Sequence, residues 1–176
     1  TEGGRIMGWM KDETGLERCA ANHVALTPLS HLARAAHVFA DHTAVVYGAH
    51  RVTYAQYHGR CTRLASALAA MDVAPGDVVA TLIPNLPAQA EAHFGVPACG
   101  AVLNTINVRL DVSTVAYILA HGGAKVLLAD TQFVKLAEAA CDRMEEGTHP
   151  RIIEVPDDAA GYPATGRHPT YEEVLQ

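Results

Sequence analysis

The sequence predicts an α/β fold, in which a mostly parallel sheet is flanked by helices and preceded by an early β-hairpin. Three apolar runs of strand length, at 78–83, 101–105 and 125–129, are each followed by a helical pattern of about 10–15 residues. The run at 78–83 is almost uninterrupted, as in strands that are covered on both faces. Because strands that alternate with helices form right-handed βαβ units, we expect these strands to lie parallel.

The first predicted elements are a helix and a hairpin. Thr27 is a candidate N-cap, Pro28 is tolerated at the first helical position, and apolar residues recur at three- and four-residue spacing as far as Phe39. Two β-rich runs follow at 44–47 and 51–54. The Gly-Ala-His sequence between them is a turn signal, so the two runs are expected to pair.

The remaining elements continue this alternation toward the C-terminus. The stretch 54–71 carries a continuous apolar stripe, which is typical of an amphipathic helix. Asn85 and Asp111 are the expected N-caps of the next two helices. The elements predicted in this part, apart from the three strands above, are the helices 87–98, 112–120 and 131–144 and the strand 151–155.

Composition divides the 176 residues into three parts. Residues 1–26 are predicted to be an N-terminal arm, because three of the first eight positions are glycine and charges are mixed. Residues 27–155 hold the α/β pattern and are long enough for one domain with a core. Residues 156–176 contain three prolines and two glycines and are predicted to be a linker toward another part of a longer protein.

Charge and cysteine usage exclude several classes of function. The net charge of −6 provides no basic field for nucleic acid, and no run of about 18 apolar residues could span a membrane. The four cysteines lie far apart, and neither they nor the histidines have the spacing of metal ligands. We therefore expect a cytoplasmic protein with reduced thiols and no metal site, and association into homo-oligomers is left open.

Most nucleotide-binding and hydrolase signatures are absent from the loops that follow the predicted strands. Ligands of open α/β sheets usually bind at these carboxyl ends. Neither G-x-G-x-x-G nor G-x-x-x-x-G-K-[ST] occurs there, and no G-x-S-x-G elbow is present. The residues alone therefore assign no catalytic side chain.

Residues 104–109 form the better of two candidate binding loops. Asn104, Asn107 and Arg109 stand just before a helix N-terminus, a place suited to polar or anionic ligand groups. Two interpretations are open, since Arg109 could instead pair with Asp111 or another acid while the asparagines cap turns.

The second candidate loop, 84–87, precedes a helix that carries His93 beside Phe94. A helical histidine next to an aromatic residue either packs at the core or its rim, or contacts a ligand. His93 is therefore the candidate substrate-binding residue.

Several longer blocks occur in a fixed order along the chain. Together they resemble the opening of adenylate-forming acyl-CoA synthetases, in the medium-chain or plant-type acyl-activating branch, over about residues 22–140. The blocks are L-T-P-L-S-H-L-A-R-A-A at 26–36, R-V-T-Y-A-Q-Y at 51–57, R-L-A-S-A-L at 63–68, G-D-V-V-A-T-L-I-P-N at 76–85, H-F-G-V-P-A-C-G-A-V-L-N-T-I-N-V-R-L at 93–110, Y-I-L-A-H at 117–121 and K-V-L-L-A-D at 125–130.

The resemblance implies a two-step reaction. A carboxylic acid attacks the α-phosphate of ATP with the help of Mg²⁺, and the CoA thiol then displaces AMP from the acyl adenylate. The parts that do this in the family are a glycine-rich loop ending in lysine, an aromatic-x-Thr-Glu motif, a ribose-binding aspartate and a lysine on a C-terminal domain. None has a counterpart in this sequence. We therefore expect an N-terminal fragment of a fatty-acid–CoA ligase type of enzyme, inactive alone and unable to bind ATP, Mg²⁺ or CoA tightly.

Matching positions carry a few binding roles over from the family. The resemblance places Asn107, Val108 and Arg109 beside the CoA route, although many relatives have proline where Val108 stands. Lys135 occupies a place from which a basic residue can reach a CoA phosphate, or it is a solvated lysine on a helix face.

Two other functions were weighed against the ligase. A stand-alone, non-catalytic α/β binding or interaction module could have kept this scaffold without the chemistry. A flavodoxin-like nucleotide binder is disfavoured, because the loops after the strands lack phosphate-cradling glycines. A gene that continues with a glycine-rich lysine loop would favour the ligase over the module.

Overall fold

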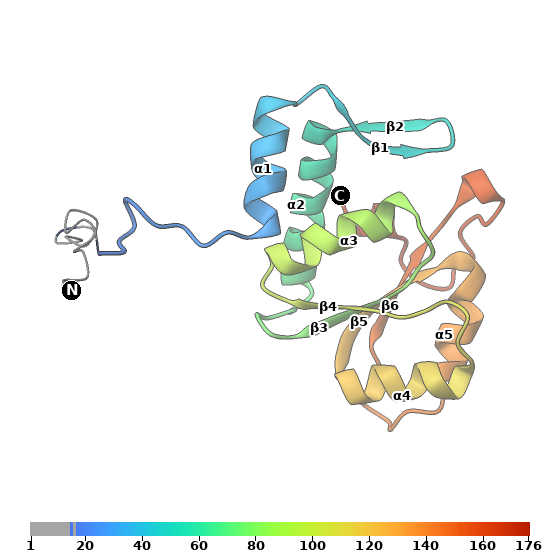
Figure 1. The fold of residues 1–176 in the computed structure, drawn as a ribbon. Coiled ribbons are helices and arrows are strands. Elements are labelled where there is room, and N and C mark those ends of the chain that lie inside the picture. Colours follow the sequence, from blue (N-terminus) through green and yellow to red (C-terminus); the bar gives the residue numbers. More distant parts are fainter. Residues whose placement is uncertain (1–14, 16) are drawn as a thin grey trace, which may run out of the picture.

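The computed structural model describes residue 15 and residues 17–176, which form a parallel sheet between two layers of helices (Figure 1). The sheet order is β4-β3-β5-β6 with every pair parallel, and β1 and β2 form a separate antiparallel hairpin. The α/β class, the mostly parallel sheet and the early hairpin are thus confirmed.

The strands are β1 (Thr43–Tyr47), β2 (His50–Thr53), β3 (Val78–Leu82), β4 (Val102–Thr105), β5 (Ala124–Asp130) and β6 (Arg151–Val155). The helices are α1 (Pro28–Val38), α2 (Tyr54–Ala70), α3 (Pro87–Ala98), α4 (Val112–Gly122), α5 (Val134–Cys141) and α6 (Tyr171–Val174), with short 3₁₀ turns η2 (Thr131–Phe133) and η3 (Asp158–Ala160).

Two of the three predicted side-chain caps are present at the predicted positions. The Thr27 hydroxyl accepts the backbone N–H of Ser30 at the start of α1, and Asp111 accepts backbone N–H groups at the start of α4. The expectation that Asn85 caps α3 is wrong, because the N-cap is Leu86 and no side chain caps this helix. Pro87 is the first helical residue and has no N–H, so one of the four backbone donors that lack an intrahelical partner at this end is absent.

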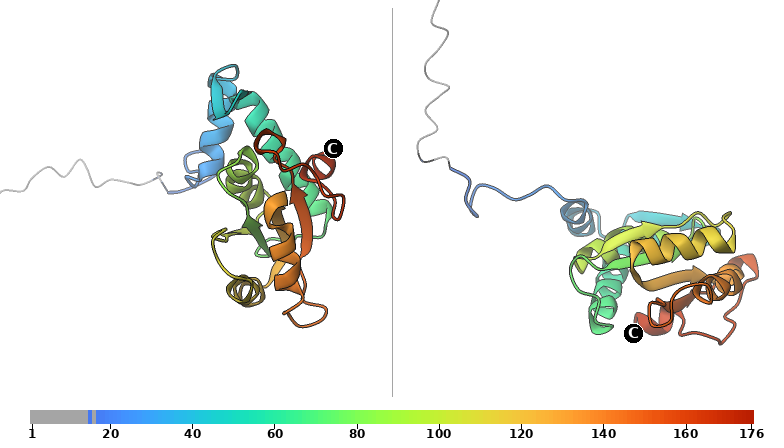
Figure 2. Two further views of the ribbon diagram at one scale, coloured as in Figure 1. Left: turned by 90° about the vertical axis from the view of Figure 1, so that its right-hand side faces the viewer. Right: turned by 90° about the horizontal axis from the view of Figure 1, so that it is seen from below.

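Alternation along the strands builds one core on each face of the sheet. Val79 of β3 faces α2 and α3, whereas its neighbours Ala80 and Leu82 face α4 and α5. The left-hand view of Figure 2 shows the same layering, with α3 (green) above the sheet and α4 (yellow) below it. This burial of both faces explains the almost uninterrupted apolar run in β3.

Helix α1 and the hairpin form a smaller third cluster against α2. Leu32, Tyr57 and Cys61 are buried there, and Val45 of β1 and Phe94 of α3 pack against them. Helices α2 and α3 approach each other closely at Gly95 of α3, where an added Cβ would lie 2.7 Å from Cδ2 of Leu64 in α2. This contact brings α3 close to α2 and to the sheet.

The C-terminal segment is packed against the α/β unit. Tyr171 and Leu175 are only 2% and 4% exposed and belong to the core on the α2 and α3 side. The Glu154 carboxylate, which is fully buried, accepts hydrogen bonds from the hydroxyls of Thr131 and Thr165 and from the backbone N–H of Thr165. The stretch predicted as a linker, 156–176, is therefore held on the molecule.

Most of the arm expected at 1–26 lies outside the described residues. Its described part, residue 15 and residues 17–26, is exposed and contains no helix or strand. The division into arm, α/β unit and linker remains a prediction.

Candidate functional site at the carboxyl edge of the sheet

The loop after β4 presents an exposed guanidinium at the carboxyl edge of the sheet. The Asn107 side chain accepts the backbone N–H of Arg109 at 2.9 Å, so Asn107 caps the turn, as the structural interpretation expects. Val108 is half-buried against the α4 and α5 core, whereas the Arg109 side chain is exposed. Within residues 17–176 no ion pair involves Arg109.

Asp111 does not pair with Arg109, because its carboxylate is used by the cap of α4. It accepts the backbone N–H groups of Ser113 and Thr114 and the hydroxyls of the same two residues. These hydrogen bonds, from Ser113 first, hold the pKa of Asp111 well below its usual range. Asp111 therefore does not engage the Arg109 guanidinium.

Asn104 is separated from this loop. It lies within β4, and its Nδ2 would be 3.1 Å from a Cβ added to Gly122 at the end of α4. The small residue at this position of α4 thus leaves room for the half-buried Asn104 side chain, which packs on the helix.

Lys135 is exposed near the start of α5. One turn later, Glu138 accepts hydrogen bonds from His168 at 3.0 Å and pairs with Arg167 at 3.1 Å. Glu138, the carboxylate nearest to Lys135 in the sequence, therefore already has His168 and Arg167 as partners. Both interpretations of Lys135 fit this exposure, and its role stays a prediction.

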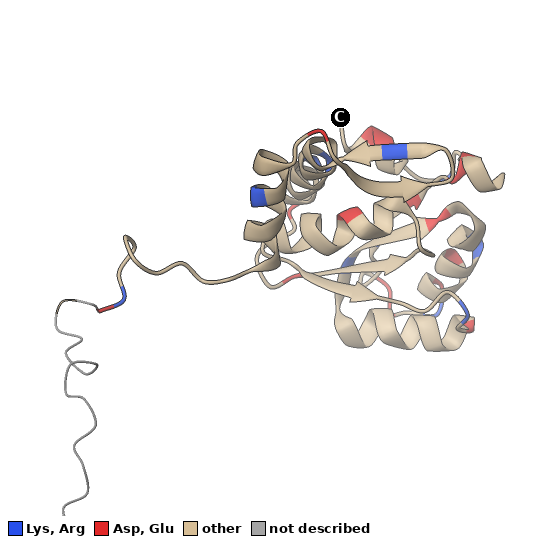
Figure 3. Ribbon diagram, turned by 45° about the horizontal axis from the view of Figure 1, so that its top comes forward, with Lys and Arg blue, Asp and Glu red and all other residues tan. Residues whose placement is uncertain are grey.

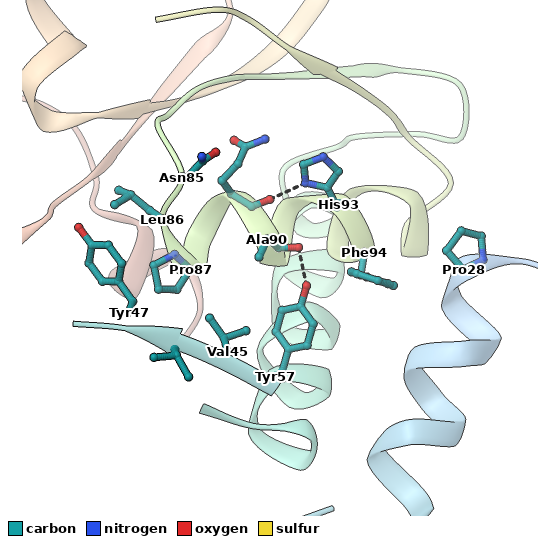
Figure 4. Close-up of a pocket in the computed structure, with 12 residues that line it drawn as sticks. Pro28, Val45, Tyr47, Tyr57, Asn85, Leu86, Pro87, Ala90, His93 and Phe94 are labelled. Carbon is teal, nitrogen blue, oxygen red and sulfur yellow. Dashed lines mark hydrogen bonds between the residues drawn. The ribbon is translucent and has the colours of Figure 1, made fainter. Parts of the chain in front are cut away.

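His93 lines an open pocket of about 650 Å³ between α3, β1 and the start of α1 (Figure 4). Its Nδ1 lies 2.8 Å from the carbonyl oxygen of Gln89. Because a carbonyl can only accept, this contact places a proton on Nδ1, and no residue within 17–176 is a hydrogen-bond partner of Nε2. The pocket is mainly apolar and is lined by Pro28, Val45, Val46, Tyr47, Tyr57, Asn85, Leu86, Pro87, Gln89, Ala90, His93 and Phe94.

The structure does not gather all the predicted binding residues in one place. His93 lines the pocket beside α1 and β1, and that pocket includes neither the loop with Arg109 nor Lys135. Asn107, Val108 and Arg109 lie together in one loop because they are consecutive in the sequence. Their roles in binding, and that of His93, remain predictions.

A cluster that sequence reasoning missed lies where β5 and β6 end. The Tyr47 hydroxyl donates to Asp157 at 2.6 Å, and this bond, together with burial, raises the pKa of Tyr47 to about 12. Asp130 is fully buried, and within residues 17–176 its Oδ1 accepts the backbone N–H of Gln132 while its Oδ2 has no partner. The available signal was an acidic residue at or just after the end of each of two apolar strands, Asp130 in β5 and Asp157 two residues after β6.

Burial raises the pKa of Asp130, so the folded protein binds its proton more tightly than the unfolded chain does. Stability from this group therefore increases as pH falls from neutral through its folded-state pKa. Asp130→Asn keeps the acceptor for Gln132 and removes the charge, and should raise the free energy of unfolding at pH 7.5 by about 1 kcal/mol. Urea unfolding between pH 4 and 8 would show that this gain in the free energy of unfolding becomes smaller as the pH falls. The control variant Asp142→Asn, at an exposed site, should show no such gain. A loss of stability at pH 7.5 would contradict the prediction.

In the part of the chain that the structure describes, the basic residues are spread over several elements. Figure 3 shows Lys and Arg positions separated along the helices and strands. Among the described residues, no three His, Cys, Asp or Glu side chains are grouped so that they could hold a metal ion. The helices of that same part of the chain are too short or too polar to cross a membrane.

Comparison with known proteins identifies the family. The model of the family described as AMP-binding enzyme matches residues 32–173. The chain is 48% identical over 136 residues to the peroxisomal acetate/butyrate–CoA ligase of Arabidopsis thaliana, covering 77% of this chain and 24% of that enzyme. It is 46% identical over 127 residues to the peroxisomal trans-cinnamate:CoA ligase of Petunia hybrida, covering 72% and 22%. The chain thus spans about a quarter of the length of these relatives.

Solved structures of the same kind share the fold. The benzoate CoA ligase of Burkholderia xenovorans superposes with a TM-score of 0.74 at 22% identity, over 86% of this chain and 28% of that one. A fatty acyl CoA synthetase of Mycobacterium tuberculosis gives 0.65 at 31% identity, over 73% and 26%. The fold is therefore that of acyl-CoA ligases.

These relatives also overturn one expectation from composition. The acetate/butyrate, trans-cinnamate and benzoate ligases are peroxisomal enzymes, so the cytoplasmic location inferred from reduced cysteines is contradicted. Reduced cysteines do not distinguish these compartments. The match to the family model and the plant relatives agree with the resemblance seen in the sequence blocks, and this chain belongs to the family of AMP-binding enzymes.

Proposed function

We propose that this chain is the N-terminal part of an ATP-dependent acyl-CoA synthetase, which converts a carboxylic acid, ATP and CoA into acyl-CoA, AMP and pyrophosphate. The observation that carries the proposal is the family match over residues 32–173 in a chain that spans 24% of a CoA ligase. The ligase relatives act on acetate, butyrate, trans-cinnamate and benzoate, so the acyl group is left open.

In this proposal the 176 residues provide scaffold and no site for ATP. A triphosphate requires backbone amides, cations and a metal ion arranged to meet its charge. The sequence has no glycine-rich phosphate loop, and the described residues hold no group of metal ligands. ATP and Mg²⁺ would therefore bind to residues outside this sequence, and the chain alone would be inactive.

The part of the reaction that this chain would serve is CoA binding. Arg109 is exposed on a loop whose turn is fixed by Asn107, so the direction of the loop is set before any ligand arrives. We assign Asn107, Val108 and Arg109 to the CoA route and Lys135 to a CoA phosphate. His93, whose Nε2 has no hydrogen-bond partner within residues 17–176, lies in a mainly apolar pocket and is the substrate-binding candidate.

The proposal is tested on the intact gene product and on residues 1–176. The intact product should catalyse ATP–pyrophosphate exchange with acetate, butyrate, trans-cinnamate or benzoate and form the CoA thioester. Residues 1–176 alone should show no binding of ATP·Mg²⁺ in titration calorimetry. A micromolar dissociation constant for that chain would place the nucleotide site within it. An intact product that ends near residue 176 would favour the non-catalytic module.

Arg109→Ala in the intact enzyme should raise the apparent KM for CoA up to about fivefold, because one exposed charge contact contributes about 0–1 kcal/mol. The apparent KM for ATP should stay unchanged. Arg151→Ala is the matched control, since Arg151 is exposed at the opposite, amino end of β6. Equal changes in both KM values would indicate that Arg109 has a structural role instead.

A further inference from the structure

A charged network that the proposed CoA route does not use ties the last helix to the body of the molecule. Arg60 of α2 donates from Nε to Glu91 of α3 at 2.5 Å. The two terminal nitrogens of the same guanidinium donate to both carboxylate oxygens of Glu172 in α6, at 3.1 and 2.5 Å. Glu91 also accepts the Tyr171 hydroxyl at 2.8 Å, which closes the network.

Burial differs sharply between the two ends of this network. The side chain of Glu91 is 1% exposed and that of Arg60 is 24% exposed, whereas that of Glu172 is 65% exposed. The Arg60 guanidinium also lies 5.9 Å from the centre of the Tyr171 ring. A planar fork that serves two carboxylates at once is a geometry that lysine cannot reproduce.

Stability alone does not explain the exposed half of the network. An ion pair with a carboxylate as exposed as Glu172 contributes little to stability. Helix α6, with four residues, is too short to hold its own direction, because isolated short helices are marginal in water. The start of α6 is held by the capping box of Thr170 and Glu173 and by the backbone bond from Glu154 to Pro169, and Tyr171 and Leu175 are buried. The contacts made by Arg60 join the exposed side of α6 to α2 and α3.

We propose that Arg60 is a positioning residue, which fixes the orientation of α6 and thereby the direction in which the polypeptide leaves the α/β unit at Gln176. The inference depends on the proposed function, in which the nucleotide machinery belongs to other parts of the same enzyme. Arg60 then acts on adenylate formation through α6 and has no contact with the reacting groups. Among the described residues, no hydrogen bond or ion pair of this network involves the loop that carries Arg109.

The test uses Arg60→Lys and Glu172→Gln in the intact gene product, because both substitutions keep a polar side chain of similar length and leave the buried core residues unchanged. Hydrogen exchange at the amides of residues 173–176 should become at least about tenfold faster in Arg60→Lys. The kcat of ATP–pyrophosphate exchange should fall about tenfold, since small misplacements of reacting groups are costly. The apparent KM for CoA should change less than twofold. Glu172→Gln should show smaller shifts in the same direction, and Arg63→Lys, an exposed position on the same helix, should show none.

Two results would overturn the proposal. One is unchanged amide exchange in α6 of Arg60→Lys. The other is faster exchange with a kcat equal to that of Arg63→Lys, which would leave Arg60 a purely structural role. An intact wild-type product without pyrophosphate exchange on any tested acid would instead defeat the proposed function, and amide exchange would then decide whether Arg60 holds α6.

Discussion

Arg60→Met should lower the free energy of unfolding of this chain by about 3 kcal/mol, because it leaves the buried Glu91 carboxylate without its cation. Glu91 is 1% exposed, and its remaining hydrogen-bond partner in the described residues is the Tyr171 hydroxyl. Methionine keeps much of the volume of the arginine stem, so the loss reports the uncompensated charge and not a cavity. Urea unfolding followed by circular dichroism would measure the change.

The matched controls separate charge from packing. Arg63→Met alters an exposed arginine on the same helix and should change stability by less than about 0.5 kcal/mol. The double variant Arg60→Met/Glu91→Gln removes both charges and should be at least about 1 kcal/mol more stable than the sum of the single changes predicts. Strict additivity would show that Arg60 does not stabilise the charge of Glu91.

Gly95→Ala should destabilise the protein by about 2 kcal/mol, although alanine is the better helix former. The new Cβ would lie 2.7 Å from Cδ2 and 2.9 Å from both Cβ and Cγ of Leu64. Leu64 is fully buried in the core between α2 and the sheet, so it has no free space into which to move. The helices must separate, and the contacts of both with β3 weaken.

Gly59→Ala is the control for helix propensity. Gly59 lies on α2, where an added Cβ would meet only Nη1 of Arg63, at 3.9 Å. This substitution should stabilise the protein by up to about 1 kcal/mol. Thermal unfolding of the two variants should therefore shift in opposite directions. A Gly95→Ala variant as stable as the wild type would mean that α2 and α3 are not held at this distance.

The fold class could be predicted because it follows from two local features of the sequence, the periodicity of apolar residues and the residues that cap helices. The apolar run at 78–83 is buried on both faces of the sheet, as its pattern indicates. Thr27 and Asp111 cap their helices because a short polar side chain before a helix satisfies free backbone N–H groups wherever the helix lies. Asn85 shows the limit of this reasoning, since Leu86 takes the cap position of a helix that begins with proline.

Less of the candidate site than of the fold could be predicted from the sequence. Arg109 and Asn107 could be placed at the carboxyl edge because parallel strands all end there, and the cap formed by Asn107 is a short-range hydrogen bond. Pairing of Arg109 with Asp111 could not be excluded from sequence, since the choice depends on whether the carboxylate turns toward Ser113 and Thr114. The protonation of His93 on Nδ1 depends likewise on the carbonyl of Gln89, one helical turn away.

Contacts between residues distant along the chain required the folded molecule. Nothing local distinguishes Glu91 from a solvated helix glutamate, yet it is buried because Arg60 and Tyr171, 31 and 80 positions away, supply its partners. The same holds for Tyr47 and Asp157, which lie 110 positions apart. Residue order therefore specified the elements, the parallel sheet and the family, since these follow from short-range patterns. The placement of α6, the close approach at Gly95 and the buried charges came from packing, because each depends on distant groups brought together by the whole fold.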